Sequence, residues 1–145
     1  MREYNETGRL FERRVFGVCR WRREGYLSHR VALELVQKHQ PEKETAFAHE
    51  LRAKVAECLA APVATVKFFT AVGENPMDRM HGIDAVLMVG SVTVMLDLTK
   101  NPLKNTTKAD ILVKETDLFD LETIAGRIVR FIASRSGRVN YWRAA

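Results

Sequence analysis

Two aspartates stand in neighbouring segments that otherwise look like the interior of a sheet. Asp84 lies near the start of the apolar segment 83–89, and Asp97 lies near the end of the apolar segment 92–99. A buried carboxylate without a partner costs several kcal/mol or gives up its charge. We therefore expect this pair to have a partner, which could be a metal ion, a lysine or a hydrogen-bond network.

The two segments are separated by a tight turn at Gly90 and Ser91, which predicts a β-hairpin. Each aspartate is about six residues from this turn, and side chains alternate along a strand, so the two carboxylates should lie side by side on one face. Two like charges at that distance repel unless a cation bridges them or one is protonated. Carboxylate oxygens are the ligands that Mg²⁺ prefers. The pair therefore predicts a site for Mg²⁺, or Mn²⁺, at Asp84 and Asp97.

The elements around this hairpin follow from hydrophobic periodicity and from turn residues. The pattern predicts helices over 7–23, 28–38 and 42–61, strands over 63–72, 83–89, 92–99 and 109–115, and a closing helix that begins at Asp117 or Asp120 and ends at Gly137. This order predicts an α/β fold with a mixed sheet of about four strands flanked by helices. We interpret residues 1–145 as a single domain, in which 1–40 form a basic helical extension, 41–135 the α/β core and 136–145 a basic tail.

Composition limits the class of protein. The chain has 145 residues, of which 46% are apolar and 28% are charged, as is typical of one globular domain. No apolar run is long enough to cross a membrane, and the N-terminal residues lack the apolar stretch of a secretory signal. We therefore expect a cytoplasmic protein with no membrane partner. Cys19 and Cys58 are too few and too far apart to indicate a disulfide framework or a zinc site.

Positive charge is concentrated at the two ends of the chain. Residues 1–40 carry nine Lys or Arg against five Glu, residues 126–145 carry five Arg and no acid, and residues 41–125 carry nine basic and thirteen acidic side chains. Basic ends would attract a polyanion, and an acidic centre could hold a divalent cation. The candidate nucleic-acid contacts are Arg13, Arg14, Arg20, Arg22, Arg23 and His81. The alternative is that these arginines only make the helix surface soluble and that His81 is an exposed loop residue.

Two short stretches resemble motifs of the PD-(D/E)XK nuclease superfamily, which has the restriction-endonuclease-like fold. The stretch "HGIDAVL" (81–87) looks like the strand that carries the first aspartate of that family, and "VMLDLTK" (94–100) looks like the strand that carries the second acid. The resemblance covers about residues 42–135. It implies a helix that carries a glutamate, a three-stranded meander, then a helix and a further strand, with Mg²⁺-dependent cleavage of nucleic acid as the activity.

The resemblance also implies roles for individual residues. Asp84 and Asp97 would ligate Mg²⁺ (or Mn²⁺) with help from the carbonyl of Leu98. Lys100 would orient or deprotonate the attacking water. The helical acid would be Glu50, or Glu57 in its place; the alternative for these two glutamates is an intrahelical network with Lys54.

The third-strand motif departs from the family at one position. The family's lysine follows the second acid by two residues, where this chain has Thr99, and Lys100 comes one residue later. A shift of one residue turns a strand side chain to the opposite face. Three interpretations remain open: a bulge or the strand end turns Lys100 inward, Thr99 takes the lysine's place, or the site binds without cutting. Structural roles for the acids are open too, with Asp84 bonding backbone amides and Asp97 capping a strand end.

The sequence therefore leaves three hypotheses for function. The first is a small Mg²⁺-dependent nuclease that acts on nucleic-acid phosphodiesters. The second is a catalytically inactive nucleic-acid-binding module of the same fold. The third is a protein-interaction module whose basic helix uses Phe11, Phe16 and Trp21 as anchors. The expected partners are nucleic acid and, as an open alternative, a second copy of the chain in a homodimer.

Overall fold

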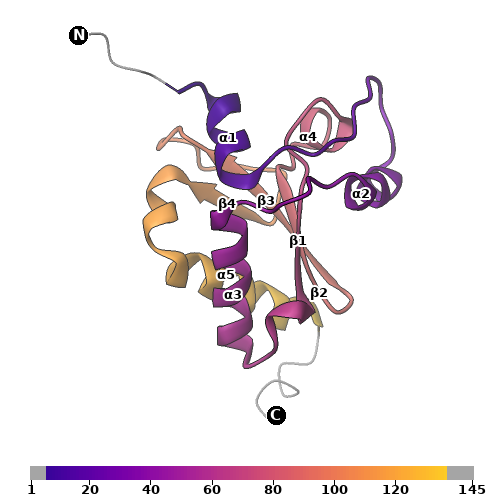
Figure 1. The fold of residues 1–145 in the computed structure, drawn as a ribbon. Helices are drawn as coiled ribbons and strands as arrows, with labels where there is room; N and C mark the ends of the chain where they lie inside the picture. Colours follow the sequence, from indigo (N-terminus) through magenta and orange to yellow (C-terminus); the bar gives the residue numbers. More distant parts are fainter. Residues whose placement is uncertain (1–5, 137–145) are drawn as a thin grey trace, which may run out of the picture.

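A four-stranded mixed sheet lies at the centre of the protein in the computed structural model, which describes residues 6–136 (Figure 1). The strands are β1 (Val66–Thr70), β2 (Ala85–Val89), β3 (Val92–Thr99) and β4 (Ile111–Lys114), and they lie in the order β1-β2-β3-β4. Neighbouring strands are antiparallel except for β3 and β4, which are parallel. The predicted α/β class and the four-stranded mixed sheet are confirmed.

The predicted hairpin is formed by β2 and β3. Its register pairs Val89 with Val92 next to the turn and Ala85 with Leu96 at the far end. Gly90 has a φ of +59°, which a glycine adopts without steric cost. The next residues outward from the last pair are Asp84 and Asp97, so the register sets the two aspartates opposite each other.

Helices cover both faces of the sheet, as Figure 1 shows. The helices are α1 (Gly8–Phe16), α2 (His29–Lys38), α3 (Ala46–Leu59), the short α4 (Pro76–Arg79) and α5 (Leu121–Ser136), with 3₁₀ turns at Val63–Thr65 and Glu115–Phe119. On one face, α1, α3 and α5 share a hydrophobic core with the sheet. On the other face, α2, α4 and the segment around Cys19 and Trp21 form a second core with β1 and β2.

The first helix is shorter than the sequence pattern predicts. It begins after Thr7, whose side chain accepts a hydrogen bond from the Leu10 amide, and it ends at Phe16. Gly17 then takes a φ of +88°, a conformation that stops a helix. The prediction of one helix over 7–23 is therefore wrong beyond residue 16. As a result Arg20, Arg22 and Arg23 lie on a non-helical segment rather than on the helix that carries Arg13 and Arg14.

The three aromatic side chains proposed as anchors for a protein partner are part of the interior. Phe11, Phe16 and Trp21 are 0%, 1% and 8% exposed. Side chains that are already buried in the fold cannot insert into a partner, so this form of the protein-interaction hypothesis is wrong. The predicted basic tail falls almost entirely outside the described residues, because residues 137–145 are not among them.

Within residues 6–136, none of the helices combines the length and the apolar character that a membrane crossing requires.

Candidate functional site

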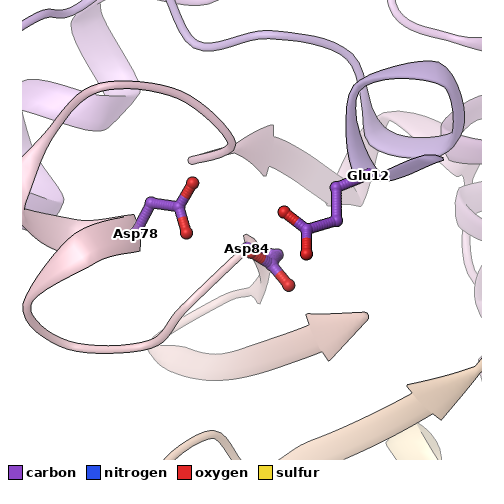
Figure 2. Close-up of side chains that lie close together, drawn as sticks. All are labelled: Glu12, Asp78 and Asp84. Atoms are coloured by element: carbon purple, nitrogen blue, oxygen red, sulfur yellow. The ribbon is translucent and has the colours of Figure 1, made fainter. Parts of the chain in front are cut away.

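Three carboxylates from three different elements meet at one end of the sheet. Glu12 comes from α1, Asp78 from α4, and Asp84 from the position just before β2. One oxygen of each lies within 4.8 Å of the others. Figure 2 shows the three side chains pointing toward one another. This separation is within reach of a single cation.

Each acid is held in place by its local structure. Glu12 follows the fully buried Phe11, which fixes that face of α1 against the sheet. Asp78 accepts hydrogen bonds from the Gly73 amide at 2.9 Å and from Nη1 of Arg9 at 3.1 Å. The neighbouring Asn75 caps α4 by accepting a hydrogen bond from the Asp78 amide at 3.1 Å. Asp78 is therefore fixed by its own side-chain contacts and by the cap.

Asp84 is bonded to β3 through both its backbone and its side chain. Its amide donates to the Leu96 carbonyl at 2.9 Å, and its Oδ2 accepts from the Leu98 amide at 2.8 Å. Asp84 is 3% exposed. The sequence alternative in which this acid bonds a backbone amide is thus present in the structure, but one amide satisfies only part of a carboxylate.

Asp97 faces the same pocket as Asp84 but already has partners. Its Oδ2 accepts hydrogen bonds from Nζ of Lys104 at 2.8 Å and from the Thr107 hydroxyl at 2.7 Å. Both donors come from the loop that links β3 to β4. Asp97 is therefore charge-compensated, and it lies beside the group formed by Glu12, Asp78 and Asp84 rather than within it.

Burial and mutual repulsion change the ionisation of two of the acids. Burial, followed by the charges of Glu12 and Asp78, raises the pKa of Asp84 to about 10. Burial, followed by the charge of Asp78, raises the pKa of Glu12 to about 7, although Arg9 opposes this change. Near neutral pH the metal-free site therefore keeps a proton on Asp84 and is poised to lose one from Glu12. A divalent cation would replace these protons.

One oxygen in the group has no hydrogen bond. Oε1 of Glu12 is buried, and within residues 6–136 no donor bonds to it. Its ion-pair partner, Nη1 of Arg9, is 3.7 Å away, beyond hydrogen-bond distance. A buried acceptor without a donor is unusual in a folded protein and calls for an explanation.

The four acids open onto a pocket of about 510 Å³. Its walls also include residues from the end of β3 and from the loop that follows it: Leu98, Thr99, Lys104, Thr106, Thr107 and Lys108. Leu98 donates its amide to Asp84, and Thr99 lines the pocket, as its alternation with Asp97 requires. Lys104 and Lys108 thus line the same pocket as the acids, and Lys104 contacts Asp97 directly.

Lys100 points away from the acids. Its Nζ donates to the Glu6 carbonyl at 3.0 Å and lies 5.7 Å from the centre of the Phe11 ring. Lys100 is not among the residues that line the pocket. The lysine that contacts an acid of this site is Lys104, four residues further along the chain.

The helical acid also differs from the predicted one. Glu50 is exposed on α3 and does not line the acidic pocket. Glu57 forms an ion pair with Lys54 at 3.2 Å, in agreement with the intrahelical alternative. Glu12 of α1 is the helical glutamate that meets the aspartates, and it lies outside the range 42–135 that the family resemblance covers.

The predicted nucleic-acid contacts do not gather in one place. Nε2 of His81 lies 2.9 Å from the Leu27 carbonyl oxygen, and the residue borders a different pocket. Arg14 is paired with Glu6 at 2.8 Å. The remaining four, Arg13, Arg20, Arg22 and Arg23, are exposed. Arg22 and Arg23 line a further pocket.

Sequence reasoning did not identify Glu12, Asp78 or Lys104. Glu12 is next to the buried Phe11 but is surrounded in sequence by arginines, which suggested a solvated basic helix. Asp78 stands three residues after Asn75 and two after Pro76, and that pattern indicates a helix start without indicating a ligand. Lys104 lies in a polar loop, where sequence alone does not indicate a direction. None of the three therefore had a sequence signal for a ligand, and only the Asn-Pro-x-Asp pattern had a signal for local structure.

The sequence matches no protein-family model, and it matches neither a curated protein nor a solved structure.

Proposed function

We propose that the pocket formed by Glu12, Asp78, Asp84 and Asp97 binds Mg²⁺ or Mn²⁺ and that the protein is a metal-dependent nuclease acting on nucleic-acid phosphodiesters. The observation that carries this proposal is the buried Oε1 of Glu12, which has no hydrogen-bond donor within residues 6–136 although the Glu12 carboxylate lies within 4.8 Å of two further carboxylates. A divalent cation would satisfy that oxygen and remove the repulsion among the acids.

The donor set fits a hard cation. Only oxygen ligands converge at the described site, and carboxylates from separate elements leave room for water and substrate oxygens in the remaining positions. Glu12, Asp78 and Asp84 would hold the ion, and Asp97 could join them if Lys104 moved away. When bound, such an ion would lower the pKa of a coordinated water and offset charge that develops on phosphate.

The side chains of this protein would contribute binding and charge. Lys104 and Lys108 border the same pocket and could contact a phosphate oxygen of the substrate. The Thr107 hydroxyl donates to Asp97 and thereby holds that carboxylate when Lys104 turns toward substrate. The raised pKa values of Glu12 and Asp84 make metal binding compete with protons, so we expect metal affinity to rise with pH.

A second candidate function is supported by a specific contact. Lys104 is already paired with Asp97 at 2.8 Å, and Thr99 stands where the family has its lysine. A protein with these two features could bind nucleic acid and a metal without cleaving the strand. This is the catalytically inactive module of the same fold.

A cleavage assay with a metal-binding assay separates the two candidates. Single- and double-stranded DNA and RNA would be incubated with Mg²⁺ or Mn²⁺, and metal binding would be followed by melting temperature. A nuclease should cleave at least one substrate, and Asp84→Asn should abolish cleavage because it removes the charge of a proposed metal ligand. The control is Glu34→Gln, which removes an exposed acid that pairs with Arg30 on α2.

Metal stabilisation without cleavage would support the inactive module. If neither metal changes the melting temperature of the wild-type protein at pH 8, the metal site is refuted and the acids are structural.

A further inference from the structure

A second pocket, which we call the arginine pocket, borders the segment that carries Asp78. It has a volume of about 630 Å³ and is lined by Arg22, Arg23 and Arg79 together with Glu24, Glu74 and Pro76. None of these residues belongs to the acidic pocket. Three guanidinium groups around a cavity of this size could hold a phosphate group by charge-assisted hydrogen bonds.

The backbone that carries Arg22 and Arg23 is fixed along its length. The Arg20 amide donates to the His39 carbonyl at 2.7 Å, and the Arg23 amide donates to the Glu74 carbonyl at 2.8 Å. Between them the Trp21 side chain is buried, while Arg22 and Arg23 are exposed. The two guanidinium groups therefore extend from an anchored segment, which lowers the entropy cost of binding an anion.

The acids of the arginine pocket neutralise only part of its charge. Glu74 contacts Arg79 at 2.5 Å and Arg9 at 3.5 Å, so two arginines share this carboxylate. Within residues 6–136, neither Arg22 nor Arg23 forms an ion pair with an acidic side chain. Two guanidinium groups thus remain free to bind a ligand, and Glu24 is the second acid of the pocket wall.

The two pockets are joined by shared structure. The segment 74–80 borders the arginine pocket, and Asp78 and Gly82 of the same stretch border the acidic pocket. Arg9 spans the boundary, because its Nη2 contacts Glu74 at 3.5 Å and its Nη1 contacts Asp78 at 3.1 Å. The segment 74–80 and Arg9 are therefore common to the surroundings of both pockets.

We infer that the substrate is a polynucleotide that occupies both pockets. Its scissile phosphodiester lies at the acidic pocket, and the arginine pocket binds a second phosphate of the same strand. A mononucleotide or a phosphomonoester is then not the substrate. The inference rests on the proposed function for the role of the acidic pocket. A mononucleotide with one phosphate group can occupy only one of the two pockets. A polynucleotide presents phosphates at regular intervals and can occupy both.

The test measures binding without metal, so that it does not depend on cleavage. A labelled single-stranded DNA oligonucleotide and its RNA counterpart would be titrated by fluorescence anisotropy in EDTA at several salt concentrations. Arg22→Gln combined with Arg23→Gln should weaken binding roughly tenfold and lower the salt slope by about 0.7 for each phosphate that is no longer neutralised. The matched control, Lys38→Gln with Lys43→Gln, removes the same charge at two exposed positions outside every described pocket and should bind like wild type.

Three results would overturn the inference. They are equal losses of affinity in the arginine and lysine variants, unchanged affinity in the arginine variant, and no wild-type binding of either oligonucleotide at low salt. A competition experiment gives a fourth such result. If an unlabelled mononucleotide displaces the labelled oligonucleotide as effectively as an unlabelled oligonucleotide does, one phosphate is sufficient for binding.

Failure of the nuclease proposal would look different. In that case Mg²⁺ and Mn²⁺ would neither stabilise the protein nor support cleavage, while binding that depends on Arg22 and Arg23 would persist in EDTA.

Discussion

Replacing Glu12 with glutamine should stabilise the metal-free protein at high pH. The pKa of this carboxyl is 4.5 in the unfolded chain and is raised to about 7 in the folded protein, first by burial and then by the charge of Asp78. The folded state therefore holds the proton more tightly than the unfolded state does. Stability must fall as pH rises through the window from 4.5 to about 7, and it should then stay level with respect to this group.

The size of the effect follows from the same two values. At about 1.4 kcal/mol for each tenfold change in acid dissociation, the ionised folded state is destabilised by about 3 kcal/mol. The side chain is 18% exposed, and solvent screening reduces this figure, so we expect about 2 kcal/mol. Glutamine has the same shape without the charge. Glu12→Gln should therefore gain about 2 kcal/mol at pH 8 and close to nothing at pH 4.

Urea unfolding in EDTA measures the effect of the Glu12 charge on stability, and urea unfolding in excess Mg²⁺ measures the stabilisation by metal. In EDTA at pH 8 the variant should be more stable than wild type. With Mg²⁺ at about a hundred times its Kd, the free energy of unfolding of wild type should rise by about 2.7 kcal/mol, and that of the variant should rise much less. The variant should then no longer be more stable than wild type. Glu34→Gln, at an exposed site on α2, should change neither value. A variant that is less stable than wild type at pH 8 in EDTA would refute the account of Glu12.

The other variants test the neighbouring contacts. Asp84→Asn keeps an acceptor for the Leu98 amide, so it should leave metal-free stability nearly unchanged at neutral pH and remove the Mg²⁺-dependent rise in melting temperature. Asp84→Ala removes that acceptor and should lower the free energy of unfolding by about 1–3 kcal/mol in chemical denaturation. Lys104→Ala should lower the cleavage rate and the substrate affinity, whereas Lys100→Ala should change neither. A kinetic assay in which Lys100→Ala has the larger effect would show that Lys100 acts in the site. Asp97→Asn should change metal-free stability by less than about 1 kcal/mol by thermal melting, because the Lys104 ammonium it releases is 37% exposed and can be hydrated; a larger effect would make Asp97 a structural acid.

The fold could be predicted from the sequence because hydrophobic periodicity, turn residues and helix caps are local signals. Alternation and the Gly90–Ser91 turn determine the hairpin and its register, and the register determines that Asp84 and Asp97 face the same side. The limits of α2 followed from its cap at Ser28 and its apolar stripe. The first helix was overextended because Phe11, Val15 and Val18 keep helical spacing past Gly17, whereas Gly17 takes a φ of +88° and ends the helix.

The site was only half predictable, because half of it is assembled by tertiary contacts. Glu12 is 72 residues from Asp84 in sequence and reaches it only because Phe11 anchors α1 across the end of the sheet. Lys104 is directed at Asp97 by the path of the loop between β3 and β4, which no periodicity describes. Tertiary contacts also decide the direction of Lys100, whose ammonium group bonds to the backbone carbonyl of Glu6. Sequence alone could not indicate that direction.

The most direct test of the metal site is anomalous diffraction from crystals grown with Mn²⁺ at pH 8. The account predicts an anomalous peak among Glu12, Asp78 and Asp84, with Oε1 of Glu12 as a ligand, and no peak there in crystals of Glu12→Gln grown in the same way. A wild-type crystal with no peak at this position, at a Mn²⁺ concentration that occupies other sites on the surface, would contradict the central claim.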